Sequence, residues 1–393
     1  MTSALMDNYK RADIAFERGE GAYLFSADGR RYLDFCSGIA VTCLGHAHPH
    51  LVKTVQDQAA KLWHTANLYE IPDQTRLAER LVADCFADRV FFCNSGMEAL
   101  EGTIKLARRT QHVNGHPERW RVITVEGAFH GRSLATISAA ANPKYLDGFG
   151  PAVDGFDNVP FGNLNALRAA ITEETAAILV EPIQGEGGIH AAKLDYLRGL
   201  RAAADEFGLL LAFDEVQCGN GRTGKMWAHQ WADAEPDILA TAKGIGGGFP
   251  MGAILATEAG AAGFTPGVHG TTFGGNQLAM AVGNAVLDVI LEDGFLDNVD
   301  RMGRLLWDRV SEVIDKFPSV YDSLRGAGLM QGIKCVVTNT DVQAALRNEG
   351  LLTVVAAENV VRLLPPLNIE ESHVDEAVDI LTRVAQGWNG GNG

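Results

Sequence analysis

Short apolar runs that alternate with amphipathic stretches are the feature of this sequence that most restricts its fold. The runs have the length of buried strands, and amphipathic segments such as 74–85 and 194–207 separate several of them. Apolar strands that alternate with helices are typical of a parallel sheet covered by helices on both faces. We therefore predict an α/β fold whose sheet contains the runs Val90–Cys93, Val122–Val125, Ala177–Val180, Leu209–Phe213 and Ile254–Ala256.

The pattern changes after about residue 285. Helical periodicity and short apolar runs are mixed there, which favours a smaller α+β domain. The glycine-rich end at 388–393 is predicted to be disordered. The expected helices lie at 297–316, 341–349 and 373–387, and the expected strands at 328–335, 351–357 and 360–366.

Charge and hydropathy exclude several classes of partner. The 393 residues carry a net charge of −16, which argues against nucleic acid and anionic membrane surfaces as partners. No apolar stretch approaches the roughly 18 residues of a membrane-spanning helix. Residues 1–21 mix charges and lack the apolar core of a secretory signal, and the six cysteines show no C-x-x-C spacing. Free thiols are typical of a reducing cytosol, so we expect a cytoplasmic protein.

A carboxylate and a lysine follow two of the apolar runs. The run LLLAF leads into Asp214, and Lys243 lies in the glycine-rich stretch TAKGIGGGFP. Pyridoxal phosphate chemistry needs both groups, because the carboxylate keeps the pyridine nitrogen protonated and the lysine forms the Schiff base that is exchanged for a substrate amine. Each group alone is more often an acidic turn or a surface lysine, so the predicted pyridoxal phosphate site depends on the pair.

A second motif in the same region indicates a different cofactor. Gly219, Gly221 and Gly224 spell G-x-G-x-x-G after a strand, the pattern of dinucleotide-binding folds. That pattern requires the glycines to open a helix and an acidic residue at the end of a second strand. Here turn-forming residues follow, and the next acidic cluster, at 233–237, lies in a proline-containing loop. A nicotinamide enzyme is therefore the weaker interpretation.

Three other segments at predicted strand ends carry candidate ligand-binding groups. Ser95 and the residues after it begin a helix, and a helix N-terminus offers free amides to a phosphate. In FHGR, Phe129 can stack on a planar ring and Arg132 can bind a carboxylate with its planar fork. The segment VEPIQGEGG places Glu181 and Glu186 around another strand end. Taken singly, each of these residues is as well explained by capping, core packing or surface charge.

A cluster of histidines at 46–50 indicates a metal site at first sight. Three histidines so close together, one of them beside a proline, do not present a tetrahedral set of ligands. We predict no metal.

The motifs, taken in order along nearly the whole chain, resemble the class III (ornithine-type) aminotransferases, which are fold-type I pyridoxal phosphate enzymes. The resemblance implies a large cofactor-binding domain at 46–285, a small α+β domain at 286–393, and an N-terminal segment, 1–45, that packs with the small domain. The segments that carry it are YLDFCSGIAVTCLGHAHP (32–49), NSGMEALEGTIKLAR (94–108), FHGR (129–132), EPIQGEGG (181–188), DEVQCGNGRTG (214–224), AKGIGGGFP (242–250), HGTTFGGN (269–276) and RLLPPL (362–367).

The resemblance implies a role for each residue around the cofactor ring. Lys243 would form the Schiff base with pyridoxal 5′-phosphate, and Asp214 would pair with the pyridine nitrogen. Gln217 would bond the ring oxygen, and Val216 and Phe129 would flank the two faces of the ring.

The phosphate of the cofactor has its own expected contacts. The resemblance implies that the amides of Gly96 and Met97 hold it with Ser95 nearby, although Met97 is bulkier than the residue usual at this position. Glu215 is also expected among the cofactor-binding residues. Thr272 would reach the phosphate of a partner subunit, which implies a homodimer with shared active sites.

The remaining implied roles concern the substrates. Arg132 would hold the α-carboxylate of the amino donor, and Thr271 would line the same pocket. Glu186 and Arg362 resemble a switch pair, in which the glutamate masks the arginine for one substrate and releases it for the other.

The expected reaction is transfer of the terminal amine of N2-acetylornithine to 2-oxoglutarate, which gives N-acetylglutamate 5-semialdehyde and glutamate in arginine biosynthesis. Ornithine, succinylornithine, succinyl-diaminopimelate and 4-aminobutyrate remain alternative donors. A pyridoxal phosphate aminomutase is the alternative from another reaction class.

Overall fold

The computed structural model describes residues 4–83 and 85–390. Its largest sheet has seven strands in the order β4-β12-β11-β10-β7-β5-β6. Strand β12 runs antiparallel to both of its neighbours, and the other neighbouring strands are parallel to each other. The five predicted apolar runs all lie in this sheet, so the predicted α/β fold is confirmed. The strands are β4 (Arg89–Cys93), β5 (Arg121–Val125), β6 (Phe156–Val159), β7 (Thr175–Val180), β10 (Leu210–Asp214), β11 (Ile238–Ala242) and β12 (Gly252–Ala256).

The central strands of this sheet are apolar throughout because both of their faces are covered. In β7 every residue is buried, and successive side chains point to opposite faces of a sheet. Ile178 packs in a hydrophobic cluster with helix α8 (Leu194–Phe207), whereas its neighbour Ala177 packs in a cluster with helix α4 (Gly96–Val113). One short run therefore contributes to two cores.

Other elements complete this part of the chain. Helices α3 and α9 pack together beside β4, and a two-stranded hairpin, β8–β9, follows β7. The helices are α2 (Pro49–Ala59), α3 (Pro72–Val82), α5 (Leu134–Ala140), α6 (Pro143–Leu146), α7 (Leu164–Ala170) and α9 (Gln277–Ile290), with short 3-10 turns at Ala228–Trp231, Lys243–Gly246 and Gly260–Gly263; the hairpin strands are β8 (Ile183–Gln184) and β9 (His190–Ala191).

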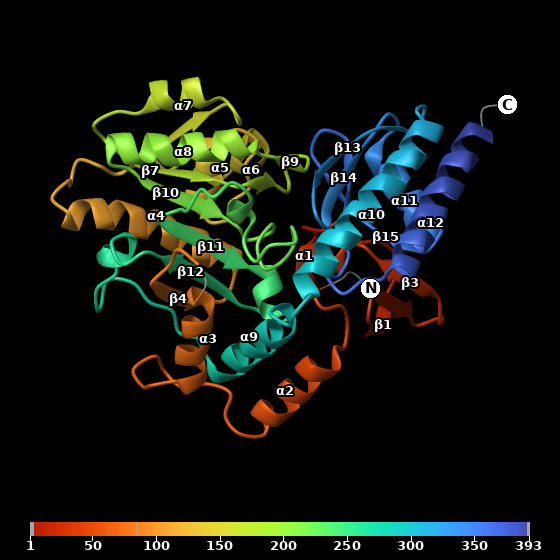
Figure 1. Ribbon diagram of the computed structural model, residues 1–393, viewed down its shortest axis with the longest axis horizontal. Helices are drawn as coiled ribbons and strands as arrows, with labels where there is room; N and C mark the ends of the chain where they lie inside the picture. Colours follow the sequence, from red (N-terminus) through yellow and green to blue (C-terminus); the bar gives the residue numbers. More distant parts are fainter. Residues whose placement is uncertain (1–3, 84, 391–393) are drawn as a thin grey trace.

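The C-terminal part has its own antiparallel sheet, in the order β13-β14-β17-β16. It lies on the right of Figure 1 with helices α10 and α12, and the seven-stranded sheet lies on the left. The helices predicted at 297–316, 341–349 and 373–387 are confirmed, but residues 388–390 continue the last helix, so the predicted disorder is wrong there; 391–393 lie outside the described residues. The elements are α10 (Phe295–Lys316), β13 (Tyr321–Ala327), β14 (Met330–Cys335), α11 (Asn339–Asn348), β16 (Val354–Ala356), β17 (Val360–Leu363) and α12 (Glu371–Gly390).

The N-terminal segment packs on this C-terminal part. Its strands β1 (Phe16–Glu20), β2 (Tyr23–Ser26) and β3 (Arg31–Asp34) precede a short helix, α1 (Ser37–Ala40), and form a sheet with β15 (Leu351–Leu352). The run predicted as one strand at 351–357 is thus divided, since β15 pairs with β3 whereas β16 pairs with β17.

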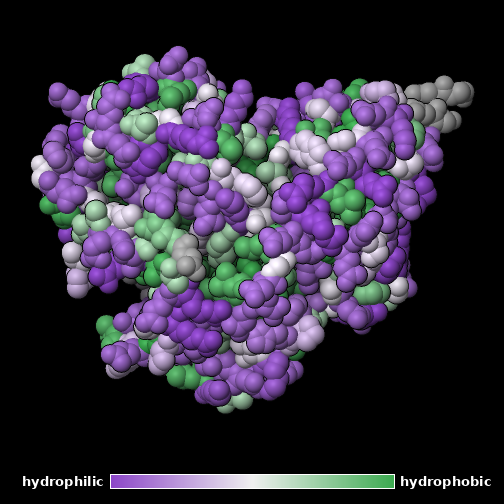
Figure 2. All heavy atoms as spheres, viewed as in Figure 1, coloured by the Kyte–Doolittle hydropathy of each residue, from purple (hydrophilic) through white to green (hydrophobic). Residues whose placement is uncertain are grey.

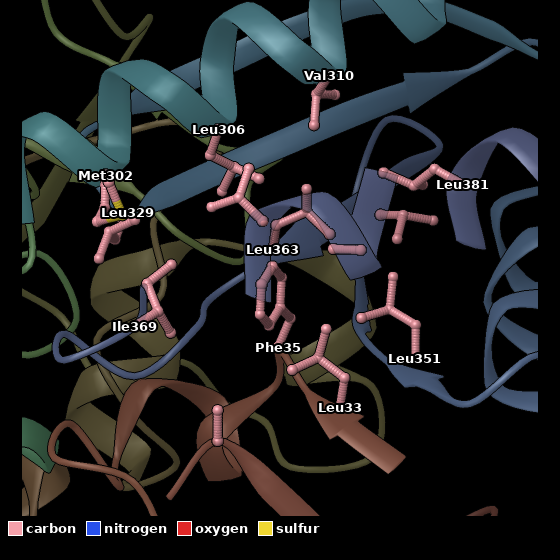
Figure 3. Packing of buried hydrophobic residues seen from close by; sticks show 14 of the residues in the cluster. Leu33, Phe35, Met302, Leu306, Val310, Leu329, Leu351, Leu363, Ile369 and Leu381 are labelled. Carbon is pink, nitrogen blue, oxygen red and sulfur yellow. The ribbon is translucent and has the colours of Figure 1, made fainter. Parts of the chain in front are cut away.

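Figure 3 shows that the N-terminal segment and the C-terminal part share one hydrophobic core. Leu33 and Phe35 from the N-terminal segment lie beside Leu351 and Leu363 from the C-terminal part, and all four are fully buried. The domain boundaries near residues 45 and 285 stay a prediction.

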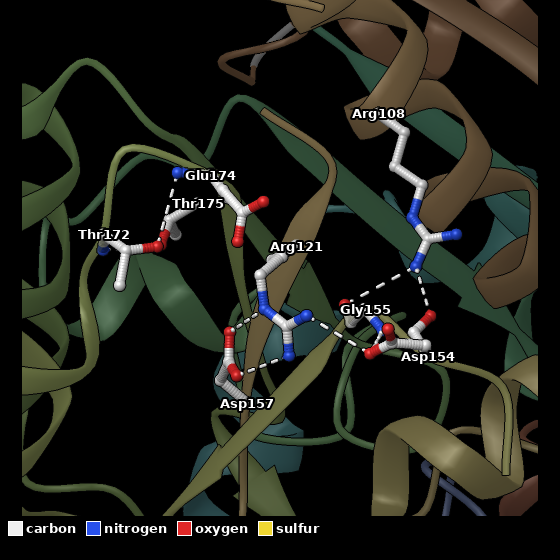
Figure 4. Close-up of polar contacts among 8 residues, drawn as sticks. All are labelled: Arg108, Arg121, Asp154, Gly155, Asp157, Thr172, Glu174 and Thr175. Atoms are coloured by element: carbon white, nitrogen blue, oxygen red, sulfur yellow. Dashed lines mark hydrogen bonds and ion pairs between the residues drawn. The ribbon is translucent and has the colours of Figure 1, made fainter. Parts of the chain in front are cut away.

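Strand β6 is an edge strand of the seven-stranded sheet, and an ion pair links it to β5. Arg121 of β5 donates to both carboxylate oxygens of Asp157 of β6 at 2.9 and 2.8 Å, and to Asp154 at 3.2 Å (Figure 4). Bidentate pairs of this kind fix geometry as well as adding energy. The edge of the sheet is therefore charged, which discourages pairing with further strands.

The surface of the molecule is mostly hydrophilic. Hydrophilic residues cover most of the face in Figure 2, and hydrophobic residues gather toward its middle, between the left and right parts of the molecule. No helix within the described residues is long and apolar enough to cross a membrane.

Candidate active site

A cavity of about 550 Å³ lies at the carboxyl ends of strands in the seven-stranded sheet. Ser95 follows β4, Asp214 ends β10 and Lys243 follows β11. Ligands bind at this edge of open α/β sheets, so the fold brings together residues that are far apart in the sequence. The predicted site residues that line the cavity are Ser95, Gly96, Met97, Phe129, Arg132, Glu186, Asp214, Val216, Gln217 and Lys243.

Helix α4 directs its N-terminus into this cavity. Ser95 caps the helix by accepting a hydrogen bond from the amide of Glu98 at 3.2 Å. Gly96 leaves room for Val216, because a Cβ at position 96 would lie 2.8 Å from Cγ1 of Val216. The unpaired amides of the first turn and the positive end of the helix dipole suit an anionic group. Ser95, Gly96 and Met97 all line the cavity at this helix end, and their expected contact with a phosphate stays a prediction.

Lys243 stands in a restricted backbone conformation beside the cavity. Its φ is 51°, in the left-handed region that a residue with a side chain rarely adopts. Desolvation is the largest influence on its amine and outweighs the attraction of Glu186 and Asp214, so the pKa of Lys243 is lowered from its ordinary value. A larger fraction of the amine is then neutral, the form that acts as a nucleophile or a base.

The carboxylate of Asp214 is held on both sides. One oxygen accepts from the amide of Val216 at 3.0 Å, and the other lies 2.8 Å from Nδ1 of His130. Asp214 is only 4% exposed. A buried carboxylate fixed in this way cannot rotate, and it faces a cavity in which a cationic ring nitrogen would be its natural partner.

His130 and Glu181 belong to the same cluster. The sequence marked Glu181 as a candidate at a strand end without giving it a role, and it did not mark His130. Burial alone lowers the pKa of His130, but its hydrogen bond with Asp214 and the charges of Asp214 and Glu181 outweigh burial and raise the pKa. Burial and the nearby Asp214 raise the pKa of Glu181. Both residues line the cavity, and Nε2 of His130 is buried with no hydrogen-bond partner among the described residues.

Both residues lie in motifs that the sequence analysis had identified. His130 lies inside the FHGR motif and Glu181 begins EPIQGEGG. Backbone amides of Phe129 and Gly185 hold the Glu181 carboxylate at 2.8 and 3.2 Å. The pairing of His130 with Asp214 joins residues 84 positions apart, and this contact could not be read from spacing.

Arg362 and Glu186 form an ion pair at 2.7 Å. Arg362 is almost completely buried, and its guanidinium also donates to the side-chain oxygen of Gln217 at 3.3 Å and to the carbonyl of Val355 at 3.0 Å. A buried arginine needs such partners, because an unpaired charge in the interior is costly. The predicted pair of Glu186 with Arg362 is thus brought together, with Glu186 and Gln217 on the cavity wall.

Arg132, unlike Arg362, has no carboxylate partner among the described residues and contacts aromatic rings instead. It is exposed and lines the cavity, and within residues 4–83 and 85–390 no carboxylate lies at ion-pair distance from it. Its guanidinium carbon lies 4.2 Å from the centre of the Tyr145 ring and 5.4 Å from that of Phe129. Its hydrogen-bonding fork therefore remains available to a ligand carboxylate.

Four of the predicted residues are not among those that line the cavity. Arg362 contacts the lining residues Glu186 and Gln217, and the other three are Glu215, Thr271 and Thr272. The carboxylate of Glu215 points away from the cavity and accepts from the amides of Ala228 and His229 and from the His229 ring, at 2.6 to 2.9 Å. Its expected contact with a cofactor stays a prediction. Thr271 lines a second cavity and accepts from Asn94 at 3.2 Å, and Thr272 lines neither cavity.

The histidines at 46–50 bond separately. His46 lies 2.8 Å from Asp34, and His50 lies 2.9 Å from Asp288. Across the part of the chain that the structure describes, no group of three or more histidine, cysteine or carboxylate side chains is arranged to hold a metal ion.

Comparison with known proteins gives consistent matches over nearly the whole chain. The family model of the class III aminotransferases matches residues 5–385. An acetylornithine aminotransferase from Mesorhizobium japonicum is 59% identical over 385 residues, which cover 98% of this chain and 96% of the relative.

Two solved structures extend the likeness to the fold. An acetylornithine aminotransferase from Elizabethkingia anophelis has a TM-score of 0.87 and 30% identity, and the match covers 97% of this chain and 96% of that one. An ornithine aminotransferase from Toxoplasma gondii, whose structure shows partial occupancy of PLP at its active site, has a TM-score of 0.94 and 29% identity; the match covers 98% of this chain and 93% of that one.

Proposed function

The chain belongs to the class III aminotransferases, and on that premise we propose that it transfers the terminal amine of N2-acetylornithine to 2-oxoglutarate. One observation carries the proposal beyond the family. Two arginines serve the same cavity, one neutralised by Glu186 and the other without a carboxylate partner among the described residues. Such a site suits two substrates that differ in the number of carboxylates near the reacting carbon. The near-full-length likeness to proteins named acetylornithine aminotransferase supports this donor.

The cavity fits the pyridoxal phosphate that the family implies. The glycine at position 96 and the free amides at the start of α4 offer a place for the phosphate, with Ser95 and Met97 beside it. Phe129 and Val216 provide apolar contacts for the two faces of a ring. The buried carboxylate of Asp214 would hold a proton on the ring nitrogen, and Gln217 would bond the ring oxygen.

When bound, pyridoxal phosphate withdraws electrons from the carbon that carries the amine and holds the amine between the two half-reactions. Lys243 would bind it covalently and, once displaced, remove a proton from the substrate carbon and return it elsewhere. The lowered pKa of Lys243 suits this role, because a general base works best when its pKa lies near the working pH. His130, held against Asp214, would keep that carboxylate in one orientation throughout.

The substrate end of the cavity accounts for the choice of substrates. A donor that reacts at its terminal amine places its α-carboxylate far from the reacting carbon, within reach of Arg132. The reacting carbon then has no carboxylate beside it, and Glu186 can stay on Arg362. 2-Oxoglutarate reacts next to a carboxylate, so it needs Arg362 released, while its distal carboxylate takes the place at Arg132.

A panel of donors with 2-oxoglutarate tests the proposal. Acetylornithine should have the highest kcat/KM, ahead of ornithine, succinylornithine, succinyl-diaminopimelate and 4-aminobutyrate. A best donor other than acetylornithine would replace the proposed substrate while leaving the reaction class unchanged. Product formation without stoichiometric consumption of 2-oxoglutarate would instead indicate an aminomutase.

We further propose that the working unit is a homodimer with shared active sites. Large apolar side chains are exposed on two neighbouring segments, and Asn67 joins these segments by donating to the carbonyls of Thr271 and Gly274 at 3.3 and 2.9 Å. Exposed apolar patches of this kind mark association surfaces. The side chains are Trp63, Leu68, Tyr69 and Phe273, which are 64%, 87%, 70% and 61% exposed.

Mixing two inactive variants tests the shared site. If Thr272 of one subunit serves the site of the other, a Thr272→Ala chain paired with a Lys243→Ala chain makes one site with both lesions and one with neither. Activity should then return on mixing. Absence of recovery after verified subunit exchange would place Thr272 outside the partner's site.

A further inference from the structure

The two arginines of the site are oriented by different means. Arg362 has a carboxylate, an amide oxygen and a carbonyl around it. Arg132 has the ring of Tyr145 at 4.2 Å as its nearest aromatic contact, and the ring of Phe129 beyond it at 5.4 Å. A guanidinium over the face of an aromatic ring is attracted by the electrons of that face. The orientation of Arg132 therefore depends on an aromatic contact.

Tyr145 is itself held in place. It lies in the four-residue helix α6, whose N-cap Asn142 accepts from the amide of Lys144 at 3.0 Å. Its ring meets Phe129 edge-on, with 5.7 Å between ring centres and 81° between ring planes. Burial raises the pKa of its hydroxyl, and the charge of Glu186 adds to this shift. Tyr145 thus connects a residue on the cavity wall with the arginine beside it.

We propose that Tyr145 is a positioning residue that sets the affinity of the site for the distal carboxylate of its substrates. This inference rests on the proposed function, in which Arg132 binds that carboxylate. Tyr145 lies outside the set of residues that line the cavity, so it acts through Arg132.

The chemistry of the contact explains why a ring is used here. An acidic partner would orient Arg132 equally well, but it would compete with the substrate carboxylate for the same N–H groups. A ring contacts the face of the guanidinium and leaves the N–H groups, which lie in its plane, free to bind a carboxylate with two parallel hydrogen bonds. The contact therefore orders the side chain without neutralising it.

Binding of glutarate to the cofactor-loaded protein tests the proposal. Glutarate has the two carboxylates of 2-oxoglutarate and lacks the reactive ketone, so calorimetry reports affinity without turnover. Tyr145→Leu should weaken glutarate binding by about three- to tenfold, the range expected for a lost cation–π contact, and Tyr145→Gln should do the same. Tyr145→Phe keeps the ring and should stay within about twofold of the unmodified protein.

A double-mutant cycle shows whether the effect passes through Arg132. In an Arg132→Ala background, Tyr145→Leu should cause no further loss of glutarate affinity, because the group that it positions is gone. Tyr23→Leu is a matched control, since Tyr23 stacks under Arg31 at 4.4 Å in the N-terminal sheet; it should leave glutarate affinity unchanged. Absorbance of the bound cofactor confirms that each variant has an intact site.

The outcomes separate this inference from the proposed function. Unchanged glutarate affinity in both ring-less variants, or an equal loss in the Arg132→Ala background, would overturn the role of Tyr145. Failure of the unmodified protein to use acetylornithine would overturn the proposed donor instead, and the glutarate comparison would keep its meaning.

Discussion

The cofactor end of the cavity and its substrate end hold their charged groups in different ways. At the cofactor end, Asp214, His130 and Glu181 are each no more than 4% exposed and are fixed by one another and by backbone amides. At the substrate end, Arg132 is exposed and Glu186 is partly exposed, and one ion pair joins Glu186 to Arg362.

The difference follows from what each end would have to do in the proposed function. The cofactor end meets the same group in both half-reactions, so rigid hydrogen bonds serve it best, because dipoles oriented in advance need no reorganisation during the reaction. The substrate end meets two unlike molecules in turn. An ion pair that can be exchanged for a ligand carboxylate suits this end, and a rigid network would suit only one substrate.

Lys243→Ala should have the largest effect of any change at the cofactor end. Both half-reactions should fall below detection, because the variant lacks the amine that binds the cofactor and moves the proton. Reduction with borohydride should also no longer fix cofactor to the chain, as mass spectrometry would show. Covalent cofactor on the reduced variant would mean that a different lysine forms the link.

Asp214→Asn should slow both half-reactions by about 10³-fold or more while the protein still binds cofactor. An amide cannot hold the proton on the ring nitrogen, and stabilisation of charge that develops in the transition state is worth several kcal/mol. Single-turnover rates with each substrate measure the effect. Rates within a few-fold of the unmodified enzyme would remove Asp214 from this role.

Arg362→Ala should slow one half-reaction much more than the other. The glutamate and 2-oxoglutarate half should slow by about 10²-fold, since a desolvated partner of a carboxylate is worth a few kcal/mol, and the acetylornithine half should change much less. Single-turnover experiments on each half show the contrast. Equal slowing of both halves would contradict the exchangeable ion pair.

The smallest expected effect concerns pH. Burial lowers the pKa of Lys243, so its amine loses its proton at a lower pH than an ordinary lysine, whose value is 10.5. The rate at which cofactor-free protein captures pyridoxal phosphate should therefore rise with pH and level off below 10.5. A simple alkylamine treated in parallel provides the reference. If the rate levelled off at the same pH as for the alkylamine, or at a higher pH, burial would not be lowering the pKa of Lys243.

The elements near the cofactor end could be predicted well from the sequence. Every residue of β7 is apolar or small, and the flanking helices have clear amphipathic patterns, so the local sequence determines these elements. The division of 351–357 between two sheets could not be foreseen, because pairing with β3, more than 300 positions away in the chain, decides where β15 ends. Long-range pairing carries no local signal.

The candidate site shows the same limit. Lys243, Asp214 and Arg362 stand in recognisable motifs, and the structure places all three at one site. Glu215 stands beside Asp214 in the sequence but points to the other face of the strand end, where His229 binds it. Tyr145 lies in a segment without a motif, and its contact with Arg132 arises only from the fold of residues 141–147.

The ratio of the two half-reaction rates in Glu186→Ala tests the central claim most directly. Without Glu186, Arg362 stays uncovered for both substrates, so glutamate should gain over acetylornithine by roughly tenfold in single-turnover kcat/KM, in line with the loss of one charge pair. Glu186→Gln, which keeps the shape and removes the charge, should shift the ratio in the same direction. An unchanged ratio, or one that moves toward acetylornithine, would contradict the account of a single cavity that serves two substrates by exchanging an ion pair.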